Sequence, residues 1–339
     1  MAGTAVSFCG ATGREFTAEM PDTAGEKIVN AAPAASSALF SRLRLFIALS
    51  RTPHCLLDLA TPALAALLWL GGLPPLSVTV LGLITVFAGY TAVYALNDVV
   101  DYRADREKLS QGKVEDGEYL DAAYVRHPMA QGLLSYQEGL LWTGAWALVA
   151  LLGAYWLNPI CALIFLAGCL IEAIYCLMLE VTSLRTLVSG VVKTLGGIAA
   201  VLAVDPSPSP AFLLVLFLWL FFWEIGGQNI PADWHDLEAD GRLQAKTIPV
   251  QFGPRRAGAV ILVCLALSVA LSGVVLRLSP AGFSLPWLAL GLGAGLYLCC
   301  LPAWRLYRGG ARSQASLLFN QASYYPLALL SLCMLGLTI

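Results

Sequence analysis

The sequence predicts an all-α, polytopic membrane protein with about nine transmembrane helices. Of its 339 residues, 58% are hydrophobic and only 12% are charged, which is too apolar for an ordinary soluble domain. The apolar residues form runs that are long enough to cross about 30 Å of hydrocarbon. Because these runs are continuously apolar and rich in Leu, Ala and Gly rather than alternating, a membrane β-barrel is disfavoured.

The chain begins with a segment whose composition differs from the rest. Residues 1–40 are dominated by Ala, Ser, Thr, Pro and Gly and hold no apolar stretch of signal-peptide length, so we expect a flexible tail. Residues 41–339 then form the predicted transmembrane domain. Its spans are expected near residues 53–72, 76–97, 138–157, 159–179, 186–204, 211–230, 257–278, 285–304 and 316–338.

The basic residues predict how these spans are oriented. Lys and Arg gather before the first span and in the loops that follow the second, fourth, sixth and eighth spans, and only Arg277 lies on the other side. The positive-inside rule therefore predicts a cytoplasmic N-terminus, cytoplasmic long loops and a C-terminus outside, in the inner or plasma membrane if the source is prokaryotic. Because the basic residues follow this topology and form no separate patch, no nucleic-acid partner is expected.

Two acidic motifs lie on the predicted cytoplasmic side, at the ends of the second and sixth spans. They read NDVVDYRAD over residues 97–105 and NIPADWHDLEAD over residues 229–240. Each contains aspartates at positions i, i+3 and i+7, which a helix of about 100° per residue brings within roughly 60° of one another. We therefore expect each trio to project from one helix face. The predicted metal ligands are Asn97, Asp98, Asp101, Asp105, Asp233, Asp236 and Asp240.

The chemistry of these motifs indicates a divalent metal. Carboxylates on one face repel each other, and near hydrocarbon each charge costs on the order of 2.5–3.5 kcal/mol, so they need cations. Oxygen ligands without well-placed His or Cys partners favour Mg²⁺, and His235 is interpreted as a bystander. Capping of helix ends would explain one aspartate but not two matched trios. An ion-coupled transporter is the non-enzymatic alternative, although its acids would be expected near mid-membrane.

At these residues the sequence resembles the UbiA superfamily of intramembrane prenyltransferases. The family's signatures are similar to N-D-x-x-D-x-x-x-D after the second span and D-x-x-D-x-x-x-D followed by K-T-x-P after the sixth, where this chain reads AKTIPVQFG. The resemblance covers about residues 40 to 339. It implies helices around a central cavity that opens laterally to the lipid bilayer, Mg²⁺ as the cofactor, and an isoprenoid diphosphate donor.

The resemblance also implies a reaction, the transfer of a prenyl group from this donor to a lipophilic or aromatic acceptor, as in quinone or related lipid biosynthesis. Transfer to a sugar phosphate, a glycerol phosphate or a tetrapyrrole, and terpene cyclisation, are alternatives on the same scaffold. The allylic cation needs a dry site with aromatic faces. The candidates in the spans are Tyr90, Tyr94, Tyr175, Trp219 and Trp223. Small residues near Gly197 are expected to shape the chamber for the prenyl chain.

Roles carry over from the resemblance residue by residue. The implied catalytic residues are Asp101, Asp105, Asp233 and Tyr175, and the implied substrate-binding residues are Asn97, Arg126, Lys193, Asn229 and Lys246. A belt position for Tyr175 at the membrane interface and a snorkelling side chain for Lys193 are the alternatives at those two positions.

The chain departs from the family pattern in three places. The stretch RHPMAQGLLS carries His127 before the proline where many members read R-P-x-x-x-G, which displaces the arginine to Arg126. Gln228 and Asn229 stand where many relatives carry an Arg-Glu pair. The loop over residues 106–126 is longer than usual, and we expect it to be either a lid over the pocket or a solvated connector.

Overall fold

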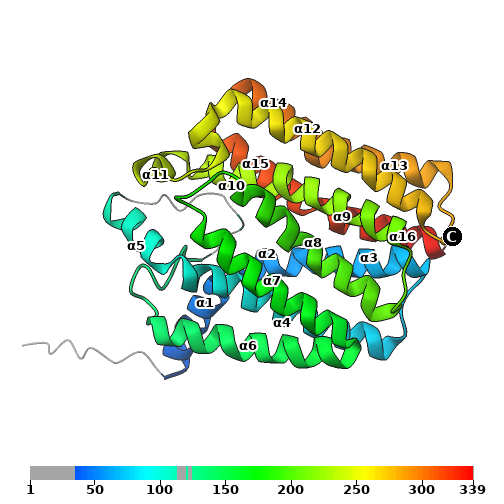
Figure 1. Cartoon of the computed structure of the whole chain (residues 1–339), viewed down its shortest axis with the longest axis horizontal. Helices are drawn as coiled ribbons and strands as arrows, with labels where there is room; N and C mark the ends of the chain where they lie inside the picture. The colour runs from blue at the N-terminus through cyan, green and yellow to red at the C-terminus, as the bar shows by residue number, and fades with distance from the viewer. Residues whose placement is uncertain (1–34, 113–119, 121–123, 339) are drawn as a thin grey trace, which may run out of the picture. The chain divides into compact units, whose positions relative to one another are not determined.

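The computed structural model describes residues 35–112, 120 and 124–338, and every described element is a helix (Figure 1). Residues Phe40–Ile339 form one compact unit, and Met1–Leu39 form a second unit of which only the start of a helix is described. The predicted tail therefore lies largely outside the described residues. In chain order the helices are α1 (Ala35–Leu49), α2 (Thr52–Asp58), α3 (Ala60–Leu70), α4 (Leu76–Val100), α5 (Tyr102–Ser110), α6 (Tyr136–Leu157), α7 (Pro159–Leu177), α8 (Arg185–Val204), α9 (Pro210–Glu224), α10 (Ile230–His235), α11 (Leu237–Arg242), α12 (Ile248–Leu278), α13 (Leu285–Gly295), α14 (Leu301–Gly309), α15 (Arg312–Ser323) and α16 (Tyr325–Thr338).

Eight helical stretches among the described residues are long and apolar enough to cross a membrane. They are Thr52–Leu70, Leu76–Val100, Tyr136–Leu157, Pro159–Leu177, Arg185–Val204, Pro210–His235, Ile248–Leu278 and Leu285–Gly309. Each overlaps a predicted span, so the predicted fold class is confirmed. The ninth predicted span, residues 316–338, corresponds to α15 and α16, which break at Tyr324 and have only 12 and 14 residues each.

Within the unit that begins at Phe40, the helices pack side by side (Figure 1). α4 packs against α6, α8 packs against α3, α7 and α9, and α12 packs against α9. A large apolar core lies between α3, α9, α12 and the C-terminal helices. Trp219 and Trp223, each 1% exposed, belong to this core and not to the cavity wall, so the prediction that they line the chamber is wrong.

Each acidic motif interrupts its helix at the middle aspartate. Asp101, with φ −81° and ψ 1°, separates α4 from α5, and Asp236, with φ −92° and ψ 7°, separates α10 from α11. The expectation of one continuous helical face for each trio is therefore wrong. These angles lie in the bridge region, where many active-site residues are found. The breaks redirect α5 and α11, and these two short helices contact each other.

A π-helical turn, Ile225–Asn229, lies inside the sixth span just before the second motif. A Cβ atom on Gly226 would lie 2.9 Å from the Cβ atom of Cys264 on α12, so only glycine permits this close approach. Such turns often occur at functional sites. Here the turn leaves both Glu224 and Asn229 on the wall of the cavity described below.

Candidate active site

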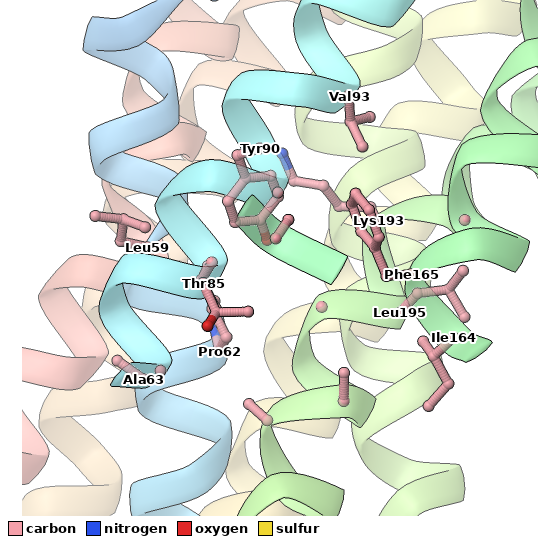
Figure 2. A pocket seen from close by; sticks show the side chains of 18 of the residues that line it. Leu59, Pro62, Ala63, Thr85, Tyr90, Val93, Ile164, Phe165, Lys193 and Leu195 are labelled. Atoms are coloured by element: carbon pink, nitrogen blue, oxygen red, sulfur yellow. The ribbon is translucent and has the colours of Figure 1, made fainter. Parts of the chain in front are cut away.

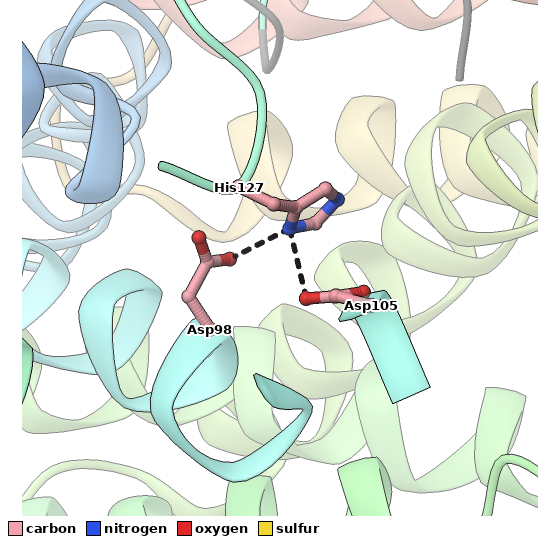
Figure 3. Close-up of side chains that lie close together, drawn as sticks. All are labelled: Asp98, Asp105 and His127. Carbon is pink, nitrogen blue, oxygen red and sulfur yellow. Dashed lines mark ion pairs between the residues drawn. The ribbon is translucent and has the colours of Figure 1, made fainter. Parts of the chain in front are cut away.

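The first acidic motif is built around His127. Asp98 lies near the end of α4 and Asp105 lies on α5, and both are buried. The Nδ1 atom of His127 lies 3.3 Å from Asp98 Oδ1 and 2.9 Å from Asp105 Oδ2 (Figure 3). The Arg51 guanidinium donates to the same Asp98 oxygen, Oδ1, at 3.1 Å and to Asn97 Oδ1 at 3.0 Å. The two carboxylates therefore share His127, and Asp98 has Arg51 as a second cationic neighbour.

Opposite charges dominate the titration of these groups. Burial would lower the pKa of His127, but Asp105 and Asp98 outweigh burial and raise it to about 9. Burial would raise the pKa of Asp105, but His127, Lys108 and Arg126 together outweigh burial and lower it. At Asp101, burial and then the charge of Asp105 raise the pKa to about 6. Asp101 is therefore half-protonated at a pH of about 6, close to neutral.

The second motif pairs each aspartate with its own cation from another segment. Arg185 Nη1 donates to Asp233 Oδ1 at 3.1 Å. Arg126 binds Asp236 with two N–H groups, at 2.8 and 2.5 Å. Lys108 Nζ lies 2.9 Å from Oδ1 of the third aspartate, Asp240. Since Lys108 is on α5 and Arg126 lies next to His127, these pairs bring the two motifs together.

The oxygen atoms of both motifs fit a hard divalent cation. Among the described residues, Asp233 Oδ2 and Asn229 Oδ1 are buried acceptors with no hydrogen-bond donor. Asp98 and Asp105 offer further carboxylate oxygens, and ligand atoms from these two residues and His127 lie within 4.8 Å of one another. Carboxylate and amide oxygens are the ligands that Mg²⁺ prefers. The residues present therefore accommodate the predicted cofactor, and His127 adds a nitrogen that the predicted ligand set does not contain.

A cavity of about 520 Å³ lies on the membrane side of the motifs. Its walls are mostly apolar, and Figure 2 shows Pro62 and Thr85 facing Phe165 and Leu195 across it. This volume is within the usual range for a small-molecule site. Gly196 lines this cavity, whereas a Cβ atom on Gly197 would meet Leu220 Cδ1 in the core at 2.7 Å. The expectation that Gly197 shapes the chamber is therefore wrong, because its neighbour Gly196 faces the cavity instead.

Three predicted tyrosines line the cavity, namely Tyr90, Tyr94 and Tyr175. The Tyr175 hydroxyl accepts a hydrogen bond from Asn229 Nδ2 at 2.9 Å, and the Arg185 guanidinium lies 4.1 Å from the centre of its ring. Tyr175 thus lies inside the bundle beside the second motif and is not a belt residue at the membrane interface. Asn97, at the same end of the cavity, donates to Glu172 Oε1 at 2.9 Å.

Lys193 also lines the cavity. Its ammonium lies 2.6 Å from Asp58 Oδ2 and 4.0 Å from Glu224 Oε2. A lysine held by two buried carboxylates does not snorkel to the surface. Lys246 is half-buried, and its backbone N–H donates to the carbonyl oxygen of Leu179, just after α7 ends.

Two further sequence expectations concern the surroundings of the motifs. His235 uses both ring nitrogens for contacts with α15, to Ser316 at 2.7 Å and to Arg312 at 3.0 Å, which agrees with its interpretation as a bystander.

Within the loop over residues 106–126, segments 113–119 and 121–123 lie outside the described residues, so its role as a lid or connector stays a prediction.

Sequence reasoning missed several charged residues that the structure places at the site. They are Arg51, Asp58, Lys108, Arg185 and Glu224. A signal was present for two of them, because Asp58 and Glu224 are ionisable residues within apolar spans, and such residues are functional candidates by default.

Comparison with known proteins agrees with this geometry. The model of the UbiA prenyltransferase family matches residues 59–325. The digeranylgeranylglyceryl phosphate synthase of Thermococcus kodakarensis is 25% identical over 247 residues, which cover 73% of this chain and 82% of that protein. A UbiA homologue from Aeropyrum pernix has 19% identity and a TM-score of 0.64, covering 84% of this chain and 97% of its own. A UbiA homologue from Archaeoglobus fulgidus, solved with GPP and Mg²⁺, has 17% identity and a TM-score of 0.64, and the match covers 87% of this chain and 100% of the homologue's chain.

The two solved structures share the fold of this chain. Because their sequence identity to it is low, the likeness supports a shared fold and not a shared function. The family model reaches from the first membrane span into the last helices, and thus includes both acidic motifs and most of the residues that line the cavity. The chain belongs to the UbiA prenyltransferase family.

Proposed function

We propose that this prenyltransferase transfers the prenyl group of an isoprenoid diphosphate, with Mg²⁺ bound by the two acidic motifs, to a lipophilic acceptor within the membrane. The observation that carries the proposal is the charged cap of carboxylates and cations at one end of a 520 Å³ cavity with apolar walls. A prenyl diphosphate has the same two halves, a charged head and a hydrocarbon chain. The Archaeoglobus fulgidus homologue, solved with GPP and Mg²⁺, supports this choice of donor and metal.

The cations of the cap suit a leaving diphosphate. Lys108, Arg126 and Arg185 all reach the carboxylates of the second motif, so they supply N–H donors for phosphate oxygens beside the proposed metal ligands. Fixed donors of this kind stabilise charge that develops on the leaving group. Bound Mg²⁺ would add Lewis-acid stabilisation of the same charge. The apolar walls below keep competing water away from the allylic carbon, and Tyr90 and Tyr94 offer aromatic faces to it.

Two acceptor classes are candidates. An aromatic acceptor, as in quinone or related lipid biosynthesis, is what the sequence resemblance implies. A glyceryl phosphate acceptor is favoured by the names of two relatives, the digeranylgeranylglyceryl phosphate synthases of Thermococcus kodakarensis and Pyrococcus abyssi. A panel that contains hydroquinone, 4-hydroxybenzoate and geranylgeranylglyceryl phosphate separates the two classes.

The test is the release of diphosphate from GPP and longer donors by purified protein in lipid nanodiscs. We expect release in the presence of a suitable acceptor to require Mg²⁺. The Asp233→Asn variant is the matched control, because it keeps the shape of the side chain and removes its charge, and its rate should fall on the order of 100-fold or more. If the folded protein releases no diphosphate from any donor, ion-coupled transport becomes the better explanation.

A further inference from the structure

A second group of ionisable side chains lies in the membrane part of the bundle, in and behind the cavity wall. Its centre is Lys193 of α8, whose ammonium donates to Asp58 Oδ2 at 2.6 Å and to the Tyr94 hydroxyl at 3.3 Å. Tyr94 also donates to Asp58, and His54 Nε2 lies 3.7 Å from the other Asp58 oxygen. Asp58 is only 1% exposed. Charges at this depth are costly and mark functional positions.

Glu224 presents an unused acceptor to the cavity. Its Oε1 atom accepts a hydrogen bond from Ser189 at 2.8 Å, and its Oε2 atom lies 4.0 Å from Lys193 Nζ. The residue is 7% exposed, and Oε2 has no hydrogen-bond donor among the described residues. The buried hydroxyl of Tyr90, another residue of the cavity wall, also lacks a hydrogen-bond partner there. Two buried polar atoms without partners beside one cavity indicate a ligand with a polar group.

The depth of this group suits an acceptor. On α4, Tyr94 lies about one helical turn below Asn97 of the first motif and Tyr90 about two turns below, which is about 5 to 10 Å along the helix. At the end of α9, Glu224 directly precedes the π-helical turn, whose last residue is Asn229. A diphosphate held at the motifs would place its first carbon atoms at this level. Figure 2 shows Tyr90 and Lys193 together beside the cavity.

We propose that Glu224 is the catalytic base for the acceptor, with its Oε2 atom binding and deprotonating the acceptor's hydroxyl group while Lys193 and Ser189 hold the carboxylate in place. This inference rests on the proposed prenyl transfer. Asp58 and Glu224 bring two carboxylates to one ammonium, so a phosphate or carboxylate group at Oε2 would meet a like charge. An uncharged hydroxyl can donate to Oε2 instead, and phenols and glycerol lipids both carry one.

The step balances in atoms and electrons. The bond between the first donor carbon and the diphosphate oxygen breaks, and its electron pair leaves with the diphosphate. The acceptor O–H bond breaks, its proton goes to Glu224 Oε2, and the electron pair forms the new bond to the donor carbon. In a phenol, the ring carbon next to the C–O carbon can form the new bond with this electron pair. The proton of that ring carbon then moves to the oxygen and restores the hydroxyl group.

The experiment separates donor binding from transfer. Glu224→Gln keeps the shape of the side chain and an acceptor for Ser189 but removes the base, and Asp233→Asn is the control at the donor site. Binding of geranylgeranyl S-thiolodiphosphate with Mg²⁺ is measured by calorimetry, and transfer is measured with hydroquinone and with geranylgeranylglyceryl phosphate, which distinguish the two sources of the hydroxyl. Thermal unfolding of each variant establishes that it is folded, and Glu224→Asp serves as the second variant.

We expect Glu224→Gln to bind the thiolo analogue within about threefold of wild type and to lose transfer by on the order of 100-fold or more, the usual contribution of a general base. Glu224→Asp should recover part of the rate. With more acidic fluorinated hydroquinones the loss should shrink, because they need less help to ionise, and a purely structural role would not produce this trend. Transfer by Glu224→Gln at the wild-type rate overturns the proposal, as does a loss of analogue binding like that of Asp233→Asn. A wild-type protein that binds no analogue contradicts the proposed function itself.

Discussion

Replacing Arg126 by alanine should make the stability of the protein depend on Mg²⁺. Arg126 holds Asp236 with two N–H groups, and the two side chains are only 11% and 14% exposed. Burial would raise the pKa of Asp236, but its cationic neighbours, Arg126 first among them and then Lys108, together outweigh burial and hold it below its usual range. In the variant, the carboxylate loses this partner and remains buried beside Asp233 and Asp240.

The magnitude follows from the burial of the pair. Removing one partner of a buried ion pair costs about 3–5 kcal/mol. At about 2 °C per kcal/mol, a value suited to larger domains, the unfolding temperature in EDTA should fall by about 6–10 °C. Excess Mg²⁺ should restore much of this loss, because a bound cation replaces the missing positive charge at Asp236. The wild type should gain less from Mg²⁺, since its carboxylate is already paired.

The assay is thermal unfolding in detergent, followed by tryptophan fluorescence, with EDTA or with excess Mg²⁺. The double variant Arg126→Ala/Asp236→Asn is the matched control, because a neutral amide needs no cation, and it should recover most of the stability in EDTA. The reasoning is refuted if Arg126→Ala unfolds at the wild-type temperature in EDTA, or if Mg²⁺ stabilises the variant no more than the wild type.

Three further outcomes are expected. Gly196→Ala should lower rates with long donors more than with short ones, whereas Gly197→Leu should mainly lower the unfolding temperature, because its side chain enters the core. Lowering the pH from 7 to 5 should weaken Mg²⁺-dependent binding of a thiolo donor by about tenfold, because Asp101 with a raised pKa of about 6 becomes protonated, and Asp101→Asn should lack this dependence. Cysteines introduced at Gln111 and Ser207 should react with impermeant thiol reagents from opposite sides, Gln111 only in inverted vesicles, and the reverse pattern would contradict the predicted orientation.

Hydropathy and motif spacing predicted the membrane spans and the two acidic motifs, because both are local properties of the chain. The break at Asp101 could not be predicted this way, since three aspartates at i, i+3 and i+7 are equally compatible with an unbroken helix. The role of His127 was also hidden. Its position before a proline was visible in the sequence, but its contacts with Asp98 and Asp105 depend on the path by which a loop returns.

Pairing between distant segments accounts for most of the rest. Asp58 and Lys193 are 135 residues apart, and each alone resembles an isolated polar residue in an apolar span. Only the folded structure, in which the end of α2 lies beside α8, shows that they form one buried pair. The same holds for Gly196 and Gly197, because a run of small residues does not reveal which of two neighbours faces the cavity and which faces the core.

The ion pairs between the acidic motifs and their basic partners also bear on how a diphosphate could enter a low-dielectric site. Each aspartate of the second motif already has a cation within 3.1 Å, so the metal-free protein buries these carboxylates without a large net charge. A donor that arrives with Mg²⁺ brings both an anion and a cation. The carboxylates would hold the metal while Lys108, Arg126 and Arg185 would hold the phosphates, so that charges exchange partners and no new unpaired charge is buried. Because an unpaired buried charge costs several kcal/mol, this exchange explains why the acidic motifs and the basic residues occur together at the mouth of an apolar cavity.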